Sequence, residues 1–278
     1  MGISLGFGGA TLTNLRSLNE ILRLLDLAFD SGIRHFDTAP LYGQGYSEVI
    51  YGKFLKDKRK QITLTTKFGL GEDNETEKIP VNLILPLNYL VKSIKKKIGK
   101  STPENTQVYS GLPYRKIEKS SIQKSFEKSL KRLKTDYVDY FLLHEGIPSF
   151  LTEEAWAYLQ QLKKENIVRN IGMGTNVFDI KTLNTNDIAL WDVLQYDYSD
   201  PLVGNEVMAK FPEKVHFHHS CLKKIDHQKL AHITPEDRGG FLLAQAASNN
   251  PGGKVIFSTR SQDSLKKNVK SFLKYLPK

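Results

Sequence analysis

The feature that most constrains this fold is a regular alternation of short apolar runs with longer segments of helical periodicity. Eight of the short runs have the length and composition of buried strands. They cover residues 3–7, 33–36, 61–67, 136–144, 168–173, 192–196, 215–218 and 254–257. No change of composition marks a linker between them. The alternation therefore predicts one α/β domain over residues 1–278, folded as a (β/α)8 TIM barrel.

One segment interrupts this alternation. Residues 70–118 separate the third strand from the next helix, an excursion of roughly 50 residues that is long for a strand-to-helix connection. The segment is acidic at first and then forms an amphipathic, basic stretch from Leu85 to Lys97. We expect an insertion that folds over the C-terminal face of the barrel and sets substrate choice. A surface for a partner protein is the alternative.

The loop after the second strand carries two titratable side chains. Asp37 lies where the strand ends, and Tyr42 follows at the mouth of the loop. Gly43 and Gly45 are expected to loosen the loop, and Ser47 to cap the helix that follows. Parallel α/β folds place their chemistry at such strand ends.

Side chains at the C-terminal ends of neighbouring barrel strands converge on one face. Asp37, Lys67 and His144 end the second, third and fourth strands, so they should lie together beneath Tyr42. An ammonium beside a phenol favours the phenolate, and Lys67 is therefore expected to lower the pKa of Tyr42. Asp37 would orient Lys67, and His144 would donate to the same reacting oxygen. This set can protonate an alkoxide, as carbonyl reduction requires, but it offers no metal site.

Several separated stretches around these residues resemble the signature sequences of the aldo-keto reductases, which are NAD(P)H-dependent barrel enzymes. The stretches are residues 32–42, 66–67, 129–139, 143–144 and 171–172. The resemblance implies that Tyr42 is the general acid, that Lys67 and Asp37 tune it, and that His144 orients the carbonyl. It also implies a nicotinamide cofactor that lies extended across the barrel mouth without a Rossmann domain.

The resemblance further implies a set of cofactor-binding residues: Gly8, Thr175, Asn176, Gln195, His218, Ser258, Thr259, Arg260 and Asn268. Gln195 matches the glutamine that binds the carboxamide, whereas Gly174 replaces a usual serine. His218 either stacks on the nicotinamide or serves packing or substrate contact. Arg260 with two adjacent hydroxyls suits a 2′-phosphate, so we expect NADPH rather than NADH. Glu145, where many relatives have an aromatic residue, would place a carboxylate beside the pocket.

Composition narrows the class of partner and the compartment. The net charge of +10 favours an anionic cofactor over nucleic acid, because the lysines are spread over many helices. A single cysteine, Cys221, excludes an internal disulfide framework and indicates a reducing compartment. No apolar run approaches the length of a membrane span, which is roughly 18 residues. We therefore expect a cytoplasmic protein.

These observations predict an NADPH-dependent oxidoreductase that reduces an aldehyde, a ketone or a sugar-type carbonyl on a small molecule. The alternative is a cofactor-binding regulatory or scaffold protein of the same fold with negligible turnover. The departures from the family pattern at Gly174 and at residues 218–221 motivate this second hypothesis.

Overall fold

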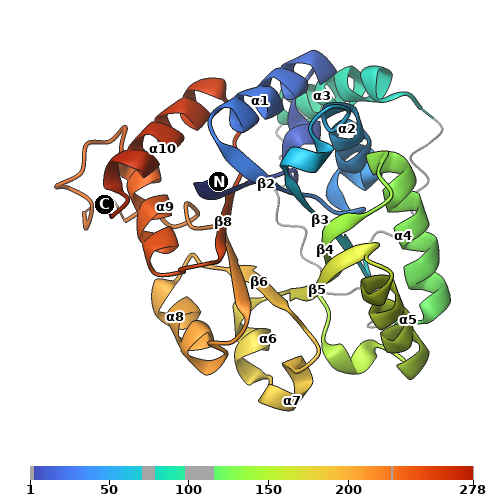
Figure 1. Cartoon of the computed structure of the whole chain (residues 1–278). Coiled ribbons are helices and arrows are strands. Elements are labelled where there is room, and N and C mark those ends of the chain that lie inside the picture. The colour runs from blue at the N-terminus through green and yellow to red at the C-terminus, as the bar shows by residue number, and fades with distance from the viewer. Residues whose placement is uncertain (1–2, 71–78, 98–115, 227, 278) are drawn as a thin grey trace.

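The computed structural model describes residues 3–70, 79–97, 116–226 and 228–277. Eight parallel strands pair in chain order and close into a barrel, with the last strand against the first (Figure 1). The predicted (β/α)8 fold is thereby confirmed. The strands are β1 Ile3–Gly8, β2 Ile33–Asp37, β3 Thr63–Phe68, β4 Val138–His144, β5 Val168–Gly174, β6 Val193–Asp197, β7 Val215–His219 and β8 Lys254–Phe257.

Helices surround the barrel and cover its outer surface (Figure 1). In the described part of the chain they are α1 Leu18–Asp30, α2 Tyr46–Phe54, α3 Val81–Lys97, α4 Lys119–Leu133, α5 Glu153–Lys164, α6 Val177–Thr182, α7 Thr185–Ile188, α8 Pro201–Lys210, α9 Arg238–Ser248 and α10 Gln262–Tyr275. Two 3-10 turns, η1 Leu12–Asn14 and η2 Tyr42–Gly45, lie between β1 and α2. Within the described ranges, no helix combines the length and apolarity needed to cross a membrane.

Several helices begin at a residue whose side chain caps the first turn, but the cap predicted for α2 is not one of them. Ser17 and Thr152 each accept a hydrogen bond from a backbone N–H in the first turn of α1 and α5. The prediction that Ser47 caps α2 is wrong, because the helix already includes Ser47 in its first turn. Its buried hydroxyl donates to the carbonyl of Gly9 at 3.2 Å and accepts from Thr38 at 2.9 Å. Ser47 thus joins α2 to the ends of β1 and β2.

The interior of the barrel is filled, so it is not a channel. A small apolar cluster occupies its centre and consists of Leu142, Val193, Phe217 and Ile256. The ring of His35 packs edge-on against Phe217 at a centroid distance of 4.8 Å. It also lies against Gly6, where a Cβ would come within 2.7 Å of the ring. Side-chain layers of this kind leave only the ends of the barrel for ligands.

Helices α2 and α4 are locked together behind β3. The buried carboxylate of Glu48 accepts from Thr66 on β3 at 2.7 Å and from Arg132 on α4 at 3.2 Å. Gly52, one turn further along α2, lies so close to α4 that a Cβ would be 2.1 Å from the carbonyl oxygen of Arg132. These contacts fix the distance between the barrel and α2, the helix that follows the loop of Tyr42.

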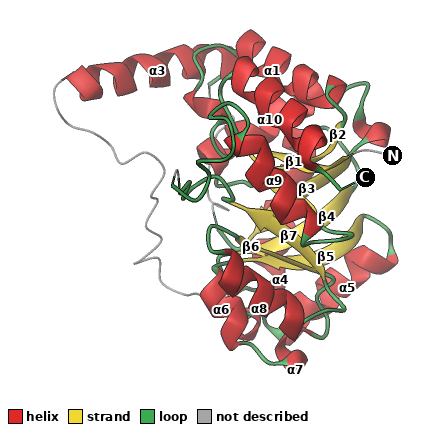
Figure 2. Ribbon diagram, turned by 90° about the vertical axis from the view of Figure 1, so that its left-hand side faces the viewer, coloured by secondary structure: helices red, strands yellow, loops and turns green. Residues whose placement is uncertain are grey.

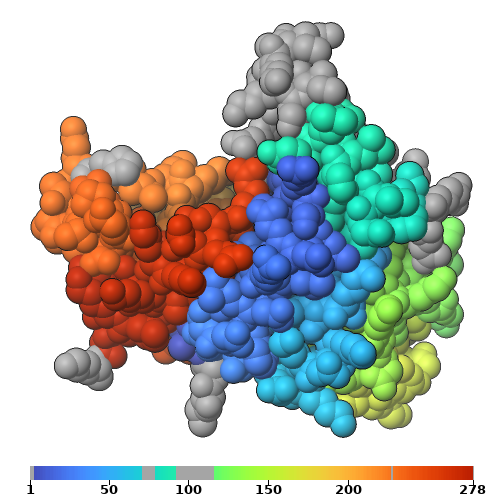
Figure 3. All heavy atoms as spheres, turned by 90° about the horizontal axis from the view of Figure 1, so that it is seen from above, coloured from blue at the N-terminus to red at the C-terminus, as the bar shows by residue number. Residues whose placement is uncertain are grey.

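The predicted insertion contributes α3 to the described structure. This helix packs against α1, α2 and η1 and projects beyond the barrel, and its surface lies beside that of the N-terminal segment (Figures 2 and 3). Val81 and Leu85 are buried in this contact, whereas Leu83, Leu87 and Leu90 are exposed. No α3 residue with a described side chain lines the cavity at the barrel mouth. Residues 71–78 and 98–115, which the expected cover over the mouth would include, lie outside the described residues.

We predict that Gly52→Ala lowers the free energy of unfolding by about 1–3 kcal/mol, because the new methyl group meets the backbone of Arg132 rather than a movable side chain. Chemical denaturation would measure the effect. Lys53→Ala, at the next and exposed position of α2, is the control and should have an unfolding free energy close to that of the wild type. Equal stability of the two variants would contradict the close contact between α2 and α4.

Candidate active site

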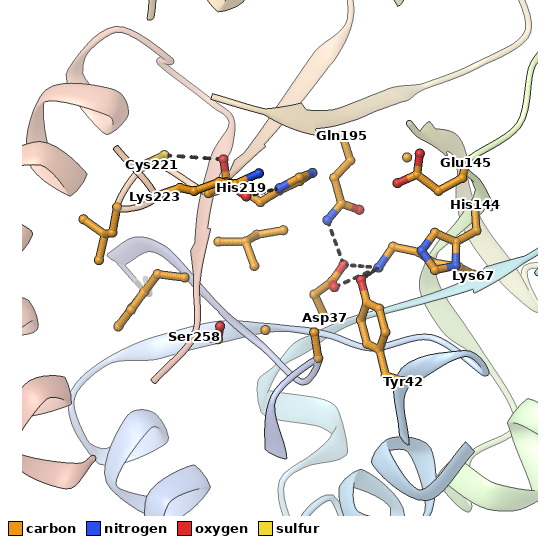
Figure 4. A pocket seen from close by; sticks show the side chains of 17 residues that line it. Asp37, Tyr42, Lys67, His144, Glu145, Gln195, His219, Cys221, Lys223 and Ser258 are labelled. Carbon is orange, nitrogen blue, oxygen red and sulfur yellow. Dashed lines mark hydrogen bonds and ion pairs between the residues drawn. The ribbon is translucent and has the colours of Figure 1, made fainter. Parts of the chain in front are cut away.

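An open cavity of about 290 Å³ lies at the carboxyl ends of the strands (Figure 4). Every strand contributes a lining residue near its C-terminal end, in order Gly8, Asp37, Lys67, His144, Gly174, Gln195, His219 and Phe257. Loop residues complete the wall and include Tyr42, Glu145, Ser220, Leu222, Lys223 and Ser258. The structure thus brings together Asp37, Tyr42, Lys67 and His144, the four side chains that strand order predicts to converge.

Lys67 is the centre of the polar network in this cavity and is only 2% exposed. Its ammonium donates to both carboxylate oxygens of Asp37, at 2.8 and 2.9 Å, and to the carbonyl of Thr38 at 3.1 Å. It also lies 3.3 Å from the phenolic oxygen of Tyr42. An ammonium has three N–H groups, and these three partners can use all of them. Because the Tyr42 oxygen accepts from Lys67, its own proton is free to point into the cavity (Figure 4).

The loop that carries Tyr42 is held by left-handed backbone. Gly43, Gln44 and Gly45 have φ values of 58°, 57° and 87°. Gly43 also packs against Thr13 of η1, where a Cβ would be 2.3 Å from the nearest methyl group. The glycines therefore permit a tight turn and a close contact, rather than loosening the loop as expected. Tyr42 is consequently fixed above the ends of β2 and β3.

The electrostatics of Tyr42 differ from the prediction. Burial, followed by the charges of Asp37 and Glu145, raises the pKa of the phenol well above its usual value. The ammonium of Lys67 does not reverse this shift, although it lies close by. Tyr42 is therefore protonated at neutral pH, which is the state that a proton donor requires.

His144 presents a neutral ring to the same place. Burial, and then the positive charge of Lys67, lower the pKa of its imidazole well below the usual value. The ring stands edge-on to that of Tyr42, with centroids 5.7 Å apart and planes at 86°. A neutral imidazole can still donate one hydrogen bond, so a bound oxygen atom can contact Tyr42 and His144 together.

Gln195 lies across the cavity from these residues and is 3% exposed. Its amide nitrogen donates to Asp37 at 3.1 Å, while its buried amide oxygen has no hydrogen-bond partner among the described residues. Gly174 leaves space next to that oxygen, because a Cβ there would be 3.4 Å from it and 3.6 Å from Lys67, both ordinary contacts. This oxygen is therefore available to accept a hydrogen bond from a water molecule or a ligand in the cavity.

Six of the nine expected cofactor residues lie outside the cavity lining, and four of them have contacts elsewhere in the fold. Thr175 is buried, and its backbone N–H donates to the carbonyl of Gln195 at 3.1 Å. The side-chain oxygen of Asn176 caps α6 by accepting from the backbone of Phe178 at 2.8 Å. The side chain of Asn268, on α10, packs against Gly239 of α9. The hydroxyl of Thr259 accepts from the backbone N–H of Ser261 in its own turn.

Gly8 and Ser258 do line the cavity, as expected. Arg260 follows two residues after Ser258 and is exposed beyond the end of β8, outside the lining. The described residues contain no group of three or more His, Cys, Asp or Glu side chains that could hold a metal ion.

His218 is not in the cavity, so the expectation that it stacks on a nicotinamide ring is wrong. Successive residues of a strand face opposite sides, and His218 points outward toward the helices. There its ring stacks on Tyr198 at 4.0 Å, with planes at 8°, and hydrogen bonds to the hydroxyl of Tyr196 at 3.1 Å.

The neighbouring residue, His219, lines the cavity instead and was missed. Its ring nitrogen lies 2.9 Å from the hydroxyl of Ser220, and burial lowers the pKa of the imidazole. The period of two in a strand is a signal that could have identified it. His219 lies two residues after Phe217, so the two side chains share a face, and Phe217 packs inside the barrel.

Comparison with known proteins agrees with this geometry. The model of the Aldo/keto reductase family matches residues 4–213. The chain is 31% identical to the D-threo-aldose 1-dehydrogenase of a Pseudomonas species over 186 residues, which are 64% of this chain and 52% of that protein. It is also 31% identical to the NADH-specific methylglyoxal reductase of Escherichia coli K12 over 183 residues, 64% of this chain and 48% of that protein. The chain thus spans about half the length of these curated relatives.

Solved structures extend the similarity of fold to the whole chain. An aldo-keto reductase from Klebsiella pneumoniae in complex with NADPH superposes with a TM-score of 0.66 and 17% identity, covering 100% of this chain and 87% of the other. The solved structure and the family model thus agree on an aldo/keto reductase barrel. This chain belongs to the aldo/keto reductase family. The matched residues include all four converging side chains and Gln195, but end before β7.

The buried histidines predict how stability depends on pH. Burial lowers the pKa of His35 and of His218 to about 3, whereas both titrate near 6.5 in the unfolded chain. Below about pH 6.5 the unfolded state therefore binds more protons, and the free energy of unfolding should fall as the pH decreases. Each such histidine contributes a slope of up to about 1.4 kcal/mol per pH unit.

Urea denaturation at several pH values between about 7 and 4 would measure this slope. His218→Gln removes one titrating group and keeps a donor for Tyr196, so its slope should be smaller than that of the wild type. His232→Gln, at an exposed position, is the control and should keep the wild-type slope. An unchanged slope in His218→Gln would contradict a neutral, buried His218.

Proposed function

We propose that this protein is an NADPH-dependent reductase of aldehyde or ketone groups in which Tyr42 is the general acid. One observation carries the proposal. A protonated phenol lies 3.3 Å from a buried ammonium, which a carboxylate holds at 2.8 Å, and a neutral imidazole stands beside that phenol. Such a set places a proton donor, the phenol, at a position where an oxygen atom can bind. The neighbouring ammonium stabilises the phenolate that remains after the proton is transferred.

The residues around this position fit a nicotinamide cofactor. The buried amide oxygen of Gln195 lacks a donor among the described residues, and a carboxamide NH₂ group supplies one. His219 offers a flat ring on the same wall, and Ser258 continues the lining toward Arg260. Arg260 would bind the 2′-phosphate that distinguishes NADPH from NADH. When bound, NADPH supplies a hydride to the carbonyl carbon.

The protein side chains would handle the carbonyl oxygen. Tyr42 and His144 each donate a hydrogen bond to that oxygen, which orients the carbonyl and polarises it. The proton of Tyr42 passes to the oxygen as negative charge develops there. Lys67 then stabilises the phenolate through the contact at 3.3 Å, and Asp37 holds the ammonium in place for this purpose.

The relatives suggest the size of the substrate. By their names, one oxidises a D-threo-aldose and another reduces methylglyoxal, so both act on small oxygenated carbonyl compounds. A cavity of about 290 Å³ accommodates molecules of that size. We propose a small aldehyde, ketone or sugar as the substrate class.

We predict that Tyr42→Phe lowers turnover by on the order of 10²-fold or more and leaves NADPH affinity nearly unchanged, because it removes one proton donor. The measurements are steady-state NADPH oxidation over a panel of aldehydes and titration of NADPH fluorescence. Intact turnover in the variant would remove Tyr42 from the acid role. NADPH binding by the wild type without turnover on any aldehyde would favour the regulatory or scaffold alternative.

We predict that Arg260→Ala weakens NADPH binding at least about tenfold more than NADH binding, because only NADPH carries the 2′-phosphate. Lys266→Ala, an exposed cation on the neighbouring turn of α10, is the control and should affect both cofactors little. One relative is NADH-specific by name, so the test also decides between the two cofactors. Equal losses of NADPH and NADH affinity in Arg260→Ala would refute the assignment.

A further inference from the structure

Two consecutive residues, His144 and Glu145, both line the cavity. Successive side chains of a strand point to opposite sides, so the residue after His144 should face the outer helices as Leu143 does. Glu145 escapes this rule because its φ is 52°, in the left-handed region. For a residue other than glycine this backbone conformation is strained, and such strain concentrates at functional sites.

The backbone around Glu145 is well held despite this conformation. Its N–H donates to the carbonyl of Gly174 at 2.8 Å, which continues the pairing of β4 with β5. Gly146 follows and packs against the side chain of Leu143. A Cβ added to Gly146 would be 3.0 Å from the nearest methyl carbon of Leu143. The turn therefore holds the backbone of Glu145 in one place next to His144.

Among the described residues, no hydrogen bond or ion pair reaches the carboxylate oxygens of Glu145. Burial raises its pKa, with Asp179 of α6 adding to the shift. The positive charge of Lys67, which lowers that pKa, is already paired with Asp37. Within the described ranges, Glu145 is thus an acceptor without a donor at this end of the cavity.

Its position separates it from the proposed cofactor wall. Figure 4 shows Glu145 beside His144, on the opposite side of the cavity from Ser258 and Lys223. Lys223 there forms an ion pair with Asp197 at 3.7 Å. A substrate whose carbonyl oxygen contacts His144 would bring its neighbouring carbon atoms next to Glu145.

We infer that Glu145 determines substrate specificity: its carboxylate accepts hydrogen bonds from hydroxyl groups on carbons next to the reacting carbonyl. The protein therefore takes neutral hydroxyaldehydes and aldoses in preference to unsubstituted aldehydes, and it disfavours aldehydes that carry a carboxylate. This inference rests on the proposed reductase function. The physical reason is that a carboxylate forms a strong hydrogen bond with a hydroxyl donor and repels a second carboxylate.

The test compares three substrates of similar size: glyceraldehyde, propanal and succinic semialdehyde. The ratio of kcat/KM for glyceraldehyde to that for propanal should fall about tenfold or more in Glu145→Leu, mainly through KM. Glu145→Gln keeps an acceptor oxygen and should retain part of this ratio, while its relative activity on succinic semialdehyde should rise. Glu165→Gln, at an exposed carboxylate that follows the end of α5, is the control and should change none of these values.

A second measurement requires no turnover. Calorimetric titration of erythritol, a neutral polyol, into protein saturated with NADPH should show binding to the wild type and at least about tenfold weaker binding to Glu145→Leu. Equal erythritol affinity, or an unchanged ratio of the two aldehydes, overturns the inference. Wild-type protein that binds erythritol through Glu145 but reduces no aldehyde keeps the hydroxyl-binding role of Glu145 and removes the proposed function, and with it the substrate preference.

Discussion

The site depends on one buried ion pair, Lys67 with Asp37. Taking two charges out of water costs several kcal/mol for each ion, so such a pair persists only when every remaining donor and acceptor is satisfied. Lys67 meets this condition with Thr38 and Tyr42, and Asp37 meets it with Gln195. The pair therefore fixes the positions of the phenol and of the amide that face each other across the cavity.

Much of this arrangement follows from the sequence because strand ends in a parallel barrel converge. The alternation of runs was enough to identify the eight strands, and their order placed Asp37, Lys67 and His144 side by side. The protonation of Tyr42 could not be predicted in the same way. The direction of its pKa shift depends on how deeply the folded chain buries it and on the nearby charge of Glu145.

Two further features depended on backbone geometry that the sequence does not reveal. The predicted strand 215–218 ends one residue before β7 does, and neighbouring residues of a strand face opposite sides. His218 therefore packs on Tyr198 while His219 lines the cavity. The left-handed turn at Glu145 is equally invisible, because nothing in the residue type indicates a positive φ there.

The ring of eight wall residues, one from each strand, has a consequence for the folding of this chain. Its members come from positions between Gly8 and Phe257, so the pocket is complete only after β8 has docked on β1. Neighbouring strands can pair early because they are close in the chain. The pairing of β8 with β1 joins the first and the last strand, which are far apart in the chain. Ligand-binding competence would therefore emerge last during refolding, as an all-or-none property of the closed barrel.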